Sequence, residues 1–167
     1  MSLMSIFHYF ANKHGQTLVH TTPATNISLA RYMGRWYEQA RFENWFEAGM
    51  EAVCTDYRLR HDGRVEVLNC GINAKGKQKQ SRGLAVVKGE GILAVSFVPP
   101  YFWFRAPYHI LYVDPEYRSA LVSGIGSDYL WLLTREVQPE PSLLTELLRQ
   151  ARLRGFNTEQ LRVTRHV

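Results

Sequence analysis

The chain has 167 residues, which suits one domain with a substantial core, and 46% of them are apolar, without a run long enough for a membrane-spanning helix. Its formal net charge is +5 at pH 7, but the basic residues are scattered rather than grouped, which argues against a nucleic-acid partner. Aromatic residues are frequent at 13%, a content that suits both a β-sheet core and a pocket for apolar ligands.

Residues 1–26 show no hydrophobic periodicity and end in a cluster of Thr, Pro and Asn. We therefore expect a flexible N-terminal arm ahead of a domain at 27–167. Residues 1–4 resemble an expression remnant before a second start methionine. The apolar stretch that follows is too short and too polar for a signal peptide, so none is expected in this chain.

From Arg35 onward, short β-rich segments recur about every ten residues and each ends in turn residues, which is typical of a β-sandwich or barrel. Eight strands are expected, at Arg35–Phe42, in a hairpin between Val53 and Gly71 that supplies two, and at 77–88, 91–98, 107–114, 118–124 and 128–135. Eight antiparallel strands can close a barrel around one small ligand. The sequence thus predicts an all-β fold, an up-and-down antiparallel barrel.

The hairpin within Val53–Gly71 has the most regular alternation of apolar and polar residues. Its turn at 61–63 places Gly63 in a left-handed position that three-residue hairpin loops favour. The resulting register pairs Leu59 with Val65, Tyr57 with Val67, Thr55 with Asn69, and Cys54 with Cys70. Both cysteines then lie on the outward face, so a disulfide between them is geometrically feasible.

After Pro139 the spacing of the apolar residues changes from that of a strand to that of a helix. Pro141 and Gly155 suit the two ends of this helix. The apolar stripe consists of Leu143, Leu144, Leu147, Leu148 and Ala151. We expect this single C-terminal helix to pack its stripe against the barrel wall, followed by a strand-like segment at 160–167.

Three motifs occur in this order among the expected elements, and they are Tyr32–Glu38, Asp114–Tyr117 and Tyr129–Arg135. Together they resemble the lipocalin family, over about residues 27–163. This resemblance is most specific to the bacterial outer-membrane lipoprotein lipocalins and their apolipoprotein D-like relatives. The resemblance implies a lipocalin calyx, in which Trp36 closes the barrel floor and Arg135 lies over it. Gly34, Asp114 and Tyr117 are the other structural motif positions.

The alternation also predicts which side chains face the barrel interior and contact a ligand. These candidates are Val53, Thr55, Tyr57, Val67, Asn69, Ala85, Val95, Phe97, Tyr108, Ile110, Tyr112 and Trp131. Each of them could equally be plain core packing, because alternation separates inside from outside but not a cavity from a filled floor. Arg41 and Arg105, with Tyr101, are candidates to bind a carboxylate or phosphate headgroup.

Two aromatic loops are expected at the rim of the barrel. Their residues are Trp45, Phe46, Tyr101, Phe102, Trp103 and Phe104. Such loops could form the mouth of the calyx, touch a membrane, become buried in a homodimer, or fold back on the protein.

Catalytic chemistry is not expected. The histidines are dispersed, and the sequence lacks a nucleophile elbow, a phosphate-binding loop and metal-ligand spacing, so we assign no catalytic residue, metal or cofactor. A few lipocalins act as isomerases through a cysteine inside the calyx, but Cys54 falls on the polar face.

The resemblance implies binding and transport or storage of a hydrophobic small molecule, a fatty acid or lysophospholipid, in the bacterial cell envelope (outer membrane or periplasm). The alternatives are a protein-interaction or dimerisation module with a filled barrel, and a lipid isomerase. Bacterial members of the family usually carry a lipid-modified N-terminal cysteine. No cysteine precedes Cys54 here, so membrane association through an anchor is only implied.

Overall fold

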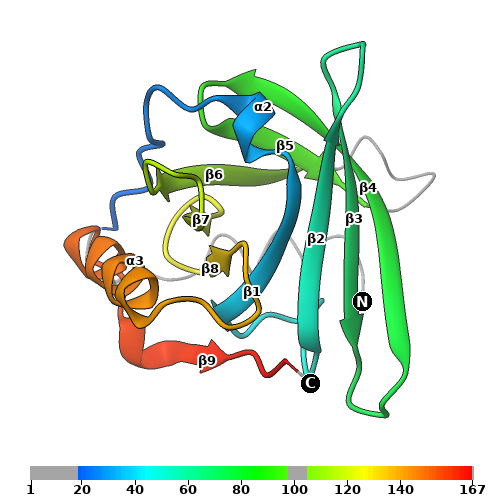
Figure 1. Ribbon diagram of the computed structural model, residues 1–167, viewed down its shortest axis with the longest axis vertical. Helices are drawn as coiled ribbons and strands as arrows, with labels where there is room; N and C mark the ends of the chain where they lie inside the picture. The colour runs from blue at the N-terminus through cyan, green and yellow to red at the C-terminus, as the bar shows by residue number, and fades with distance from the viewer. Residues whose placement is uncertain (1–18, 98–104, 167) are drawn as a thin grey trace.

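The computed structural model describes residues 19–97 and 105–166, and these form a closed antiparallel barrel with one long helix on its outer wall (Figure 1). The strands are β1 (Gly34–Phe42), β2 (Glu51–Leu59), β3 (Val65–Ile72), β4 (Gln78–Gly89), β5 (Ile92–Ser96), β6 (Ala106–Val113), β7 (Ser119–Ser123), β8 (Leu130–Thr134) and β9 (Leu161–Val163). The helices are α2 (Leu29–Tyr32), α3 (Pro141–Leu153) and the 3-10 helix η1 (Thr158–Gln160). The predicted all-β barrel with a C-terminal helix is confirmed.

The ring closes at β1. Neighbouring strands pair in the order β2 to β8, then β1, and β1 also pairs with β2, so β1 to β8 form a complete ring. Beyond Tyr37, β1 and β2 diverge and β9 pairs with β1 instead, with Val163 opposite Ala40. The Ala52 N–H donates to the Arg165 carbonyl oxygen at 2.7 Å, which ties the segment after β9 to β2 as well. The C-terminal segment therefore fills the seam between the first two strands.

The end of the barrel at which β1 begins is closed by α2, Trp36 and Arg135. Trp36 is completely buried, and its indole N–H donates to the Tyr32 carbonyl oxygen at 2.8 Å. The Arg135 guanidinium lies 3.8 Å from the centre of the Trp36 ring. Its N–H groups donate to the backbone carbonyl oxygens of Arg31, Tyr32, Arg35 and Tyr117. One cation thus joins three separate segments over the barrel floor, and a cation–π contact of this kind contributes about 0.5–2 kcal/mol.

Two other motif positions have local structural roles at this end. Gly34 has φ +95°, and a Cβ there would lie 3.3 Å from the Arg135 guanidinium, so glycine suits both the backbone and the space. The Asp114 carboxylate accepts hydrogen bonds from the backbone N–H groups of Glu116, Arg118 and Ser119, which fixes the turn between β6 and β7. Tyr117, at φ +61°, accepts a hydrogen bond from the Ser28 N–H at 2.7 Å.

The barrel wall separates two apolar clusters. The interior cluster contains Trp36 and residues from seven of the strands, whereas the outer cluster lies between the wall and α3, where Leu147 and Ala151 are fully buried. Helix α3 packs on β7 (Figure 1). Three residues of the apolar stripe predicted for this helix, Leu147, Leu148 and Ala151, thus pack on the barrel wall, as expected of an amphipathic helix.

A β-bulge in β6 corrects one sequence-based expectation. The pairing of β6 with β7 shifts between Ile110 and Tyr112, so Leu111 and Tyr112 both belong to the outer cluster while Ile110 stays in the interior cluster. One extra residue in a strand reverses the alternation beyond it. Tyr112 therefore faces outward, and its predicted place in the lining does not hold.

Residues 19–26 of the expected N-terminal arm lie against the barrel. The His20 N–H donates to the Arg154 carbonyl oxygen, and the Ala24 N–H donates to the Ile110 carbonyl oxygen, both at 2.9 Å. Val19 packs on the outer cluster. The rest of the arm, including residues 1–4, lies outside the described residues.

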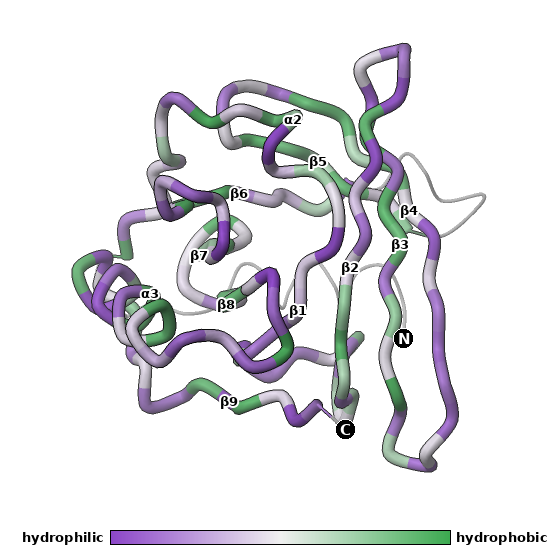
Figure 2. The backbone as a smooth tube through the Cα atoms, viewed as in Figure 1, coloured by the Kyte–Doolittle hydropathy of each residue, from purple (hydrophilic) through white to green (hydrophobic). Residues whose placement is uncertain are grey.

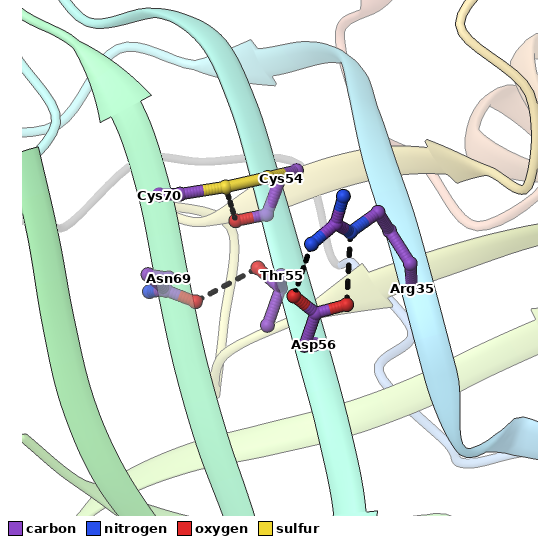
Figure 3. The surroundings of a disulfide bond; sticks show 6 residues. All are labelled: Arg35, Cys54, Thr55, Asp56, Asn69 and Cys70. Carbon is purple, nitrogen blue, oxygen red and sulfur yellow. Dashed lines mark hydrogen bonds and ion pairs between the residues drawn. A yellow bond between two sulfur atoms is a disulfide. The ribbon is translucent and has the colours of Figure 1, made fainter. Parts of the chain in front are cut away.

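The β2–β3 hairpin has the register expected from its alternation. Thr55 pairs with Asn69, Tyr57 with Val67 and Leu59 with Val65, and Cys54 pairs with Cys70. The two cysteines form a disulfide, with their Cα atoms 5.2 Å apart (Figure 3). Arg35 forms a bidentate ion pair with Asp56 beside it, so a covalent and an ionic link join three adjacent strands.

Hydrophilic residues dominate the first half of β4, which extends past β5 at the end opposite α2 (Figure 2). Residues 78–83 pair with β3 on one side, and β5 pairs with β4 only from Leu84 onward. In the part of the chain that the structure describes, no helix is long and apolar enough to span a membrane.

The floor contact predicts a specific loss of stability. Lysine at position 135 keeps the charge but lacks the planar fork that reaches several carbonyl oxygens, so Arg135→Lys should lower the free energy of unfolding by about 1–3 kcal/mol. Urea denaturation measures this difference. The control is Arg152→Lys at an exposed position near the end of α3. Equal stability of the two variants would contradict the role of Arg135.

The disulfide gives a second prediction. It joins residues 16 positions apart, and a cross-link closing a loop of about that length stabilises a protein by about 3 kcal/mol in the chain-entropy model. The double variant Cys54→Ala/Cys70→Ala should therefore unfold at lower urea concentration than the oxidised protein. The oxidised and reduced wild-type proteins, compared in the same experiment, should differ by a similar amount, and identical midpoints would contradict the prediction.

Candidate functional site in the barrel interior

The candidate site is the interior of the barrel above Trp36. Of the predicted lining residues, the interior cluster contains Tyr57, Val67, Ala85, Val95, Phe97, Tyr108, Ile110 and Trp131. Thr55 and Asn69 share this face because Thr55 is the strand partner of Trp36 as well as of Asn69. Val53 is also buried. The cluster also contains residues that are not among the predicted ligand contacts, namely Tyr32, Val65, Leu93, Ala120, Val122 and Leu133.

Several of these inward-facing side chains remain partly accessible. Thr55, Asn69, Phe97, Tyr108 and Trp131 have intermediate exposure, whereas Trp36, Val65, Ala85 and Ile110 have none. The inner face thus combines buried side chains with these five partly accessible ones, which we call the partly accessible level. This is the arrangement expected of a calyx with a filled base.

Three tyrosine hydroxyls meet in the interior. The Tyr57 hydroxyl donates to the Tyr108 hydroxyl at 2.9 Å, and the Tyr32 and Tyr108 hydroxyls share a hydrogen bond of 2.6 Å. Burial raises the pKa of Tyr57 to about 12 and raises the pKa values of Tyr32 and Tyr108 well above their usual value. All three therefore stay neutral at physiological pH.

One hydroxyl proton of this tyrosine group is not used in the hydrogen bonds within the group. Its two internal hydrogen bonds use two of its three hydroxyl protons. The third proton can be donated to an oxygen outside the group. Sequence alternation placed Tyr57 and Tyr108 on the inner face but missed Tyr32, because Tyr32 comes from α2 rather than from a strand.

A second polar group surrounds Arg41, which has no exposed surface. Its guanidinium donates to the Glu38 carboxylate at 2.6 Å, to the Glu43 carboxylate at 3.1 Å and to the Glu47 carbonyl oxygen at 2.7 Å. The Glu47 carboxylate lies 4.0 Å from the Arg41 Nε and accepts a hydrogen bond from the Trp131 indole at 2.9 Å. The Thr164 hydroxyl, from the segment after β9, also donates to Glu38.

These contacts correct the expectation that Arg41 binds an anionic headgroup. Three carboxylates lie within ion-pair distance of one guanidinium, so its positive charge is already offset. An incoming anion would meet more negative than positive charge there. The bulge between Glu38 and Ala40 explains why the sequence did not reveal this group, because it turns Ala40 and Phe42 to the outer cluster.

The Glu38 carboxyl is the most strongly perturbed acid of this group. Burial raises its pKa to about 7, and the negative charge of Glu47 adds to the rise, while Arg41 and Thr164 oppose it. Glu38 thus takes up a proton near neutral pH, at a point where β1, β9 and the β1–β2 connection meet.

A chain of aromatic rings leads from the interior to the surface. Trp131 stacks on Tyr129 with ring centres 5.8 Å apart, and Tyr129 stacks on Phe46 at 5.9 Å. Phe46 contacts Trp45 edge-on at 5.5 Å. Trp45 and Phe46, two of the predicted rim residues, are exposed. The other predicted rim residues, Tyr101, Phe102, Trp103 and Phe104, lie outside the described residues, and Arg105 is exposed.

Comparison with known proteins agrees with this architecture. The family described as "Lipocalin-like domain" matches residues 27–166. The chain belongs to the lipocalin family. The outer membrane lipoprotein Blc of Vibrio cholerae serotype O1 is 39% identical over 144 residues, covering 83% of this chain and 82% of that protein. Bovine apolipoprotein D is 30% identical over 160 residues, covering 89% and 82%.

The solved structure of lobster apocrustacyanin A1 superposes with a TM-score of 0.70 at 19% identity, over 83% of this chain and 79% of that one, which shows the shared fold. Membership of the lipocalin family supports binding of a hydrophobic ligand in this barrel, since lipocalins are in general binding and transport proteins.

Glu38 gives a pH-dependent prediction. Its pKa in the folded protein is about 7 against an ordinary value of 4.5, so the folded state holds this proton to higher pH than the unfolded chain does. Wild-type stability should therefore fall, relative to Glu38→Gln, by about 1–3 kcal/mol as the pH rises from 4.5 to 7. Urea denaturation across this range measures the difference.

The matched control is Glu159→Gln, which removes one carboxylate at an exposed position in η1. Its stability should follow that of the wild type at every pH. A constant difference between wild type and Glu38→Gln across the range would contradict the prediction.

Proposed function

We propose that the protein binds a single-chain amphiphile, a fatty acid or lysophospholipid, inside the barrel and carries or stores it in the bacterial cell envelope. The observation that carries this proposal is the partly accessible level of inward-facing residues beside a fully buried floor. An acyl chain at that level would contact Phe97, Tyr108 and Trp131. Burial of a twelve-carbon tail contributes on the order of 9 kcal/mol before the entropy of binding is subtracted.

Neutral polar groups at the same level support an amphiphile over a pure hydrocarbon. Thr55 donates a hydrogen bond to the Asn69 side-chain oxygen at 2.8 Å, and the tyrosine group has one hydroxyl proton in reserve. Such uncharged groups can orient a ligand oxygen without requiring a countercharge. The proposal therefore places the polar contacts of the ligand on these groups rather than on Arg41.

The envelope location rests on relatives. The Blc proteins of Vibrio cholerae and Escherichia coli are named outer membrane lipoproteins, and both are 39% identical to this chain. Cys54 cannot serve as the nucleophile of a lipid isomerase, because it is bonded to Cys70 and has no free thiol.

An interior-blocking substitution tests the proposal. Asn69→Trp places a large ring at the partly accessible level and should weaken binding of a fluorescent fatty acid, and of lysophospholipid that displaces it, by at least about tenfold. Leu68→Trp is the matched control, since the adjacent residue of β3 points to the opposite face and the same ring would lie outside. Fluorescence titration gives both affinities.

The free protein provides an independent readout. Native mass spectrometry after extraction from cells should show co-purified lipid with the wild type and with Leu68→Trp, and less with Asn69→Trp. A wild-type protein that carries no lipid and binds neither the fatty-acid probe nor lysophospholipid would refute the proposal. Equal binding by the two tryptophan variants would refute the interior as the site.

A further inference from the structure

Apolar side chains gather in the exposed connections at the end of the barrel opposite α2. Trp45 and Phe46, in the β1–β2 connection, are 70% and 48% exposed, and Ile125, in the β7–β8 connection, is 66% exposed. The two connections touch, because Phe46 stacks on Tyr129 just before β8. Exposed apolar residues that cluster in this way mark an interaction surface more often than isolated ones do.

Basic residues flank this cluster. The β3–β4 turn carries Lys75 and Lys77, and Lys79 follows at the start of β4, all of them exposed. The turn lies close to the β1–β2 connection, since a Cβ placed on Gly49 would be 3.4 Å from the Ala74 side chain. None of the three lysines forms an ion pair with a residue that the structure describes. We call Trp45, Phe46, Ile125 and these lysines the mouth patch.

Four acidic residues near the mouth already have interaction partners. Glu43 pairs with Arg41 and Arg162, Glu51 pairs with Arg162 and Arg165, and Glu47 is largely buried against Trp131. Asp128, in the β7–β8 connection, is half-buried and also has an interaction partner. On the β1–β2, β3–β4 and β7–β8 connections, the described charged side chains without an interaction partner are therefore lysines.

We propose that the mouth patch docks on an anionic lipid surface. Trp45, Phe46 and Ile125 enter the boundary between headgroups and acyl chains, and Lys75, Lys77 and Lys79 contact lipid phosphates. Tryptophan favours this boundary because it joins an apolar ring to a polar N–H. Clustered lysines add attraction to anionic headgroups that fades within a Debye length and is therefore sensitive to salt.

The surface combines features that fit a bilayer better than a single protein partner. Its apolar residues stand on separate connections and its charges stand to one side, so a fluid interface can accommodate them without a fixed complementary shape. Docking would turn the calyx mouth toward the bilayer. It does not depend on what the interior binds, so the two proposals can fail separately.

Vesicle co-sedimentation tests the proposal with the full chain. The probes are vesicles of phosphatidylglycerol and phosphatidylethanolamine, compared with vesicles of phosphatidylcholine alone. The wild type should bind the anionic vesicles more strongly. Trp45→Ser should weaken that binding at least about fivefold, whereas Leu153→Ser, at a position 65% exposed at the end of α3, should leave it unchanged.

A charge reversal tests the basic part. Lys75→Glu/Lys77→Glu should weaken binding to anionic vesicles at least about tenfold, since each lysine near such a surface contributes about a fivefold factor. The control Lys88→Glu/Arg152→Glu makes the same change in charge at exposed positions outside the mouth patch. High salt should reduce the difference between wild type and the mouth variant.

Further measurements separate docking from lipid uptake and from self-association. Asn69→Trp blocks the interior and should still bind anionic vesicles. Loss of vesicle binding by this variant would show that the interior extracts lipid, and would overturn docking. Docking is also overturned if the wild type does not bind anionic vesicles, or if either control variant weakens binding as much as its mouth counterpart. A third contradicting result would be a dimer in sedimentation velocity that Trp45→Ser dissociates, together with no binding to vesicles.

Discussion

The interior of this barrel depends on how β1 pairs along its two edges. At its start β1 joins β2 on one side, and farther along it joins β8 on the other, so one strand completes the ring. Where the ring is closed, no strand edge is left to pair with another chain. The bulge after Glu38 then bends β1 away from β2 and opens a seam that β9 fills. The buried charges gather at this seam, where three segments have to be held together.

Each end of the barrel is stabilised by an arginine, but the two guanidinium groups have different kinds of partner. Arg135 lies over the floor and donates its N–H groups to backbone carbonyl oxygens, with an indole ring beneath it. Arg41 lies near the mouth and is enclosed by carboxylates, because a guanidinium without exposed surface needs charge compensation. Between them, the polar side chains that the described residues place on the inner face include the hydroxyl groups of the three tyrosines and Thr55 and the amide of Asn69. A ligand beside these groups would contact neutral donors and acceptors.

Sequence reasoning was accurate where the backbone was regular. The β2–β3 hairpin alternates without interruption, so its turn fixed the register and hence the pairing of Cys54 with Cys70. The three motifs indicated the family, which the comparisons confirm. Alternation failed at bulges, because one extra residue sends Tyr112 to the outer wall. It also could not reveal the carboxylates around Arg41, which come from a strand and an irregular connection and meet only in the folded chain. Whether the lining holds a ligand stays a prediction.

The insertion of β9 between β1 and β2 has a consequence for the order in which the molecule can be completed. The first two strands pair only near the floor, and their partner toward the mouth comes after every other described strand in the chain. Synthesis delivers the N-terminal strands first. While the chain is still emerging, the seam stays open, Glu38 lacks Thr164, and the charges around Arg41 remain in contact with water. The strand that seals the wall is thus synthesised after the two strands between which it lies.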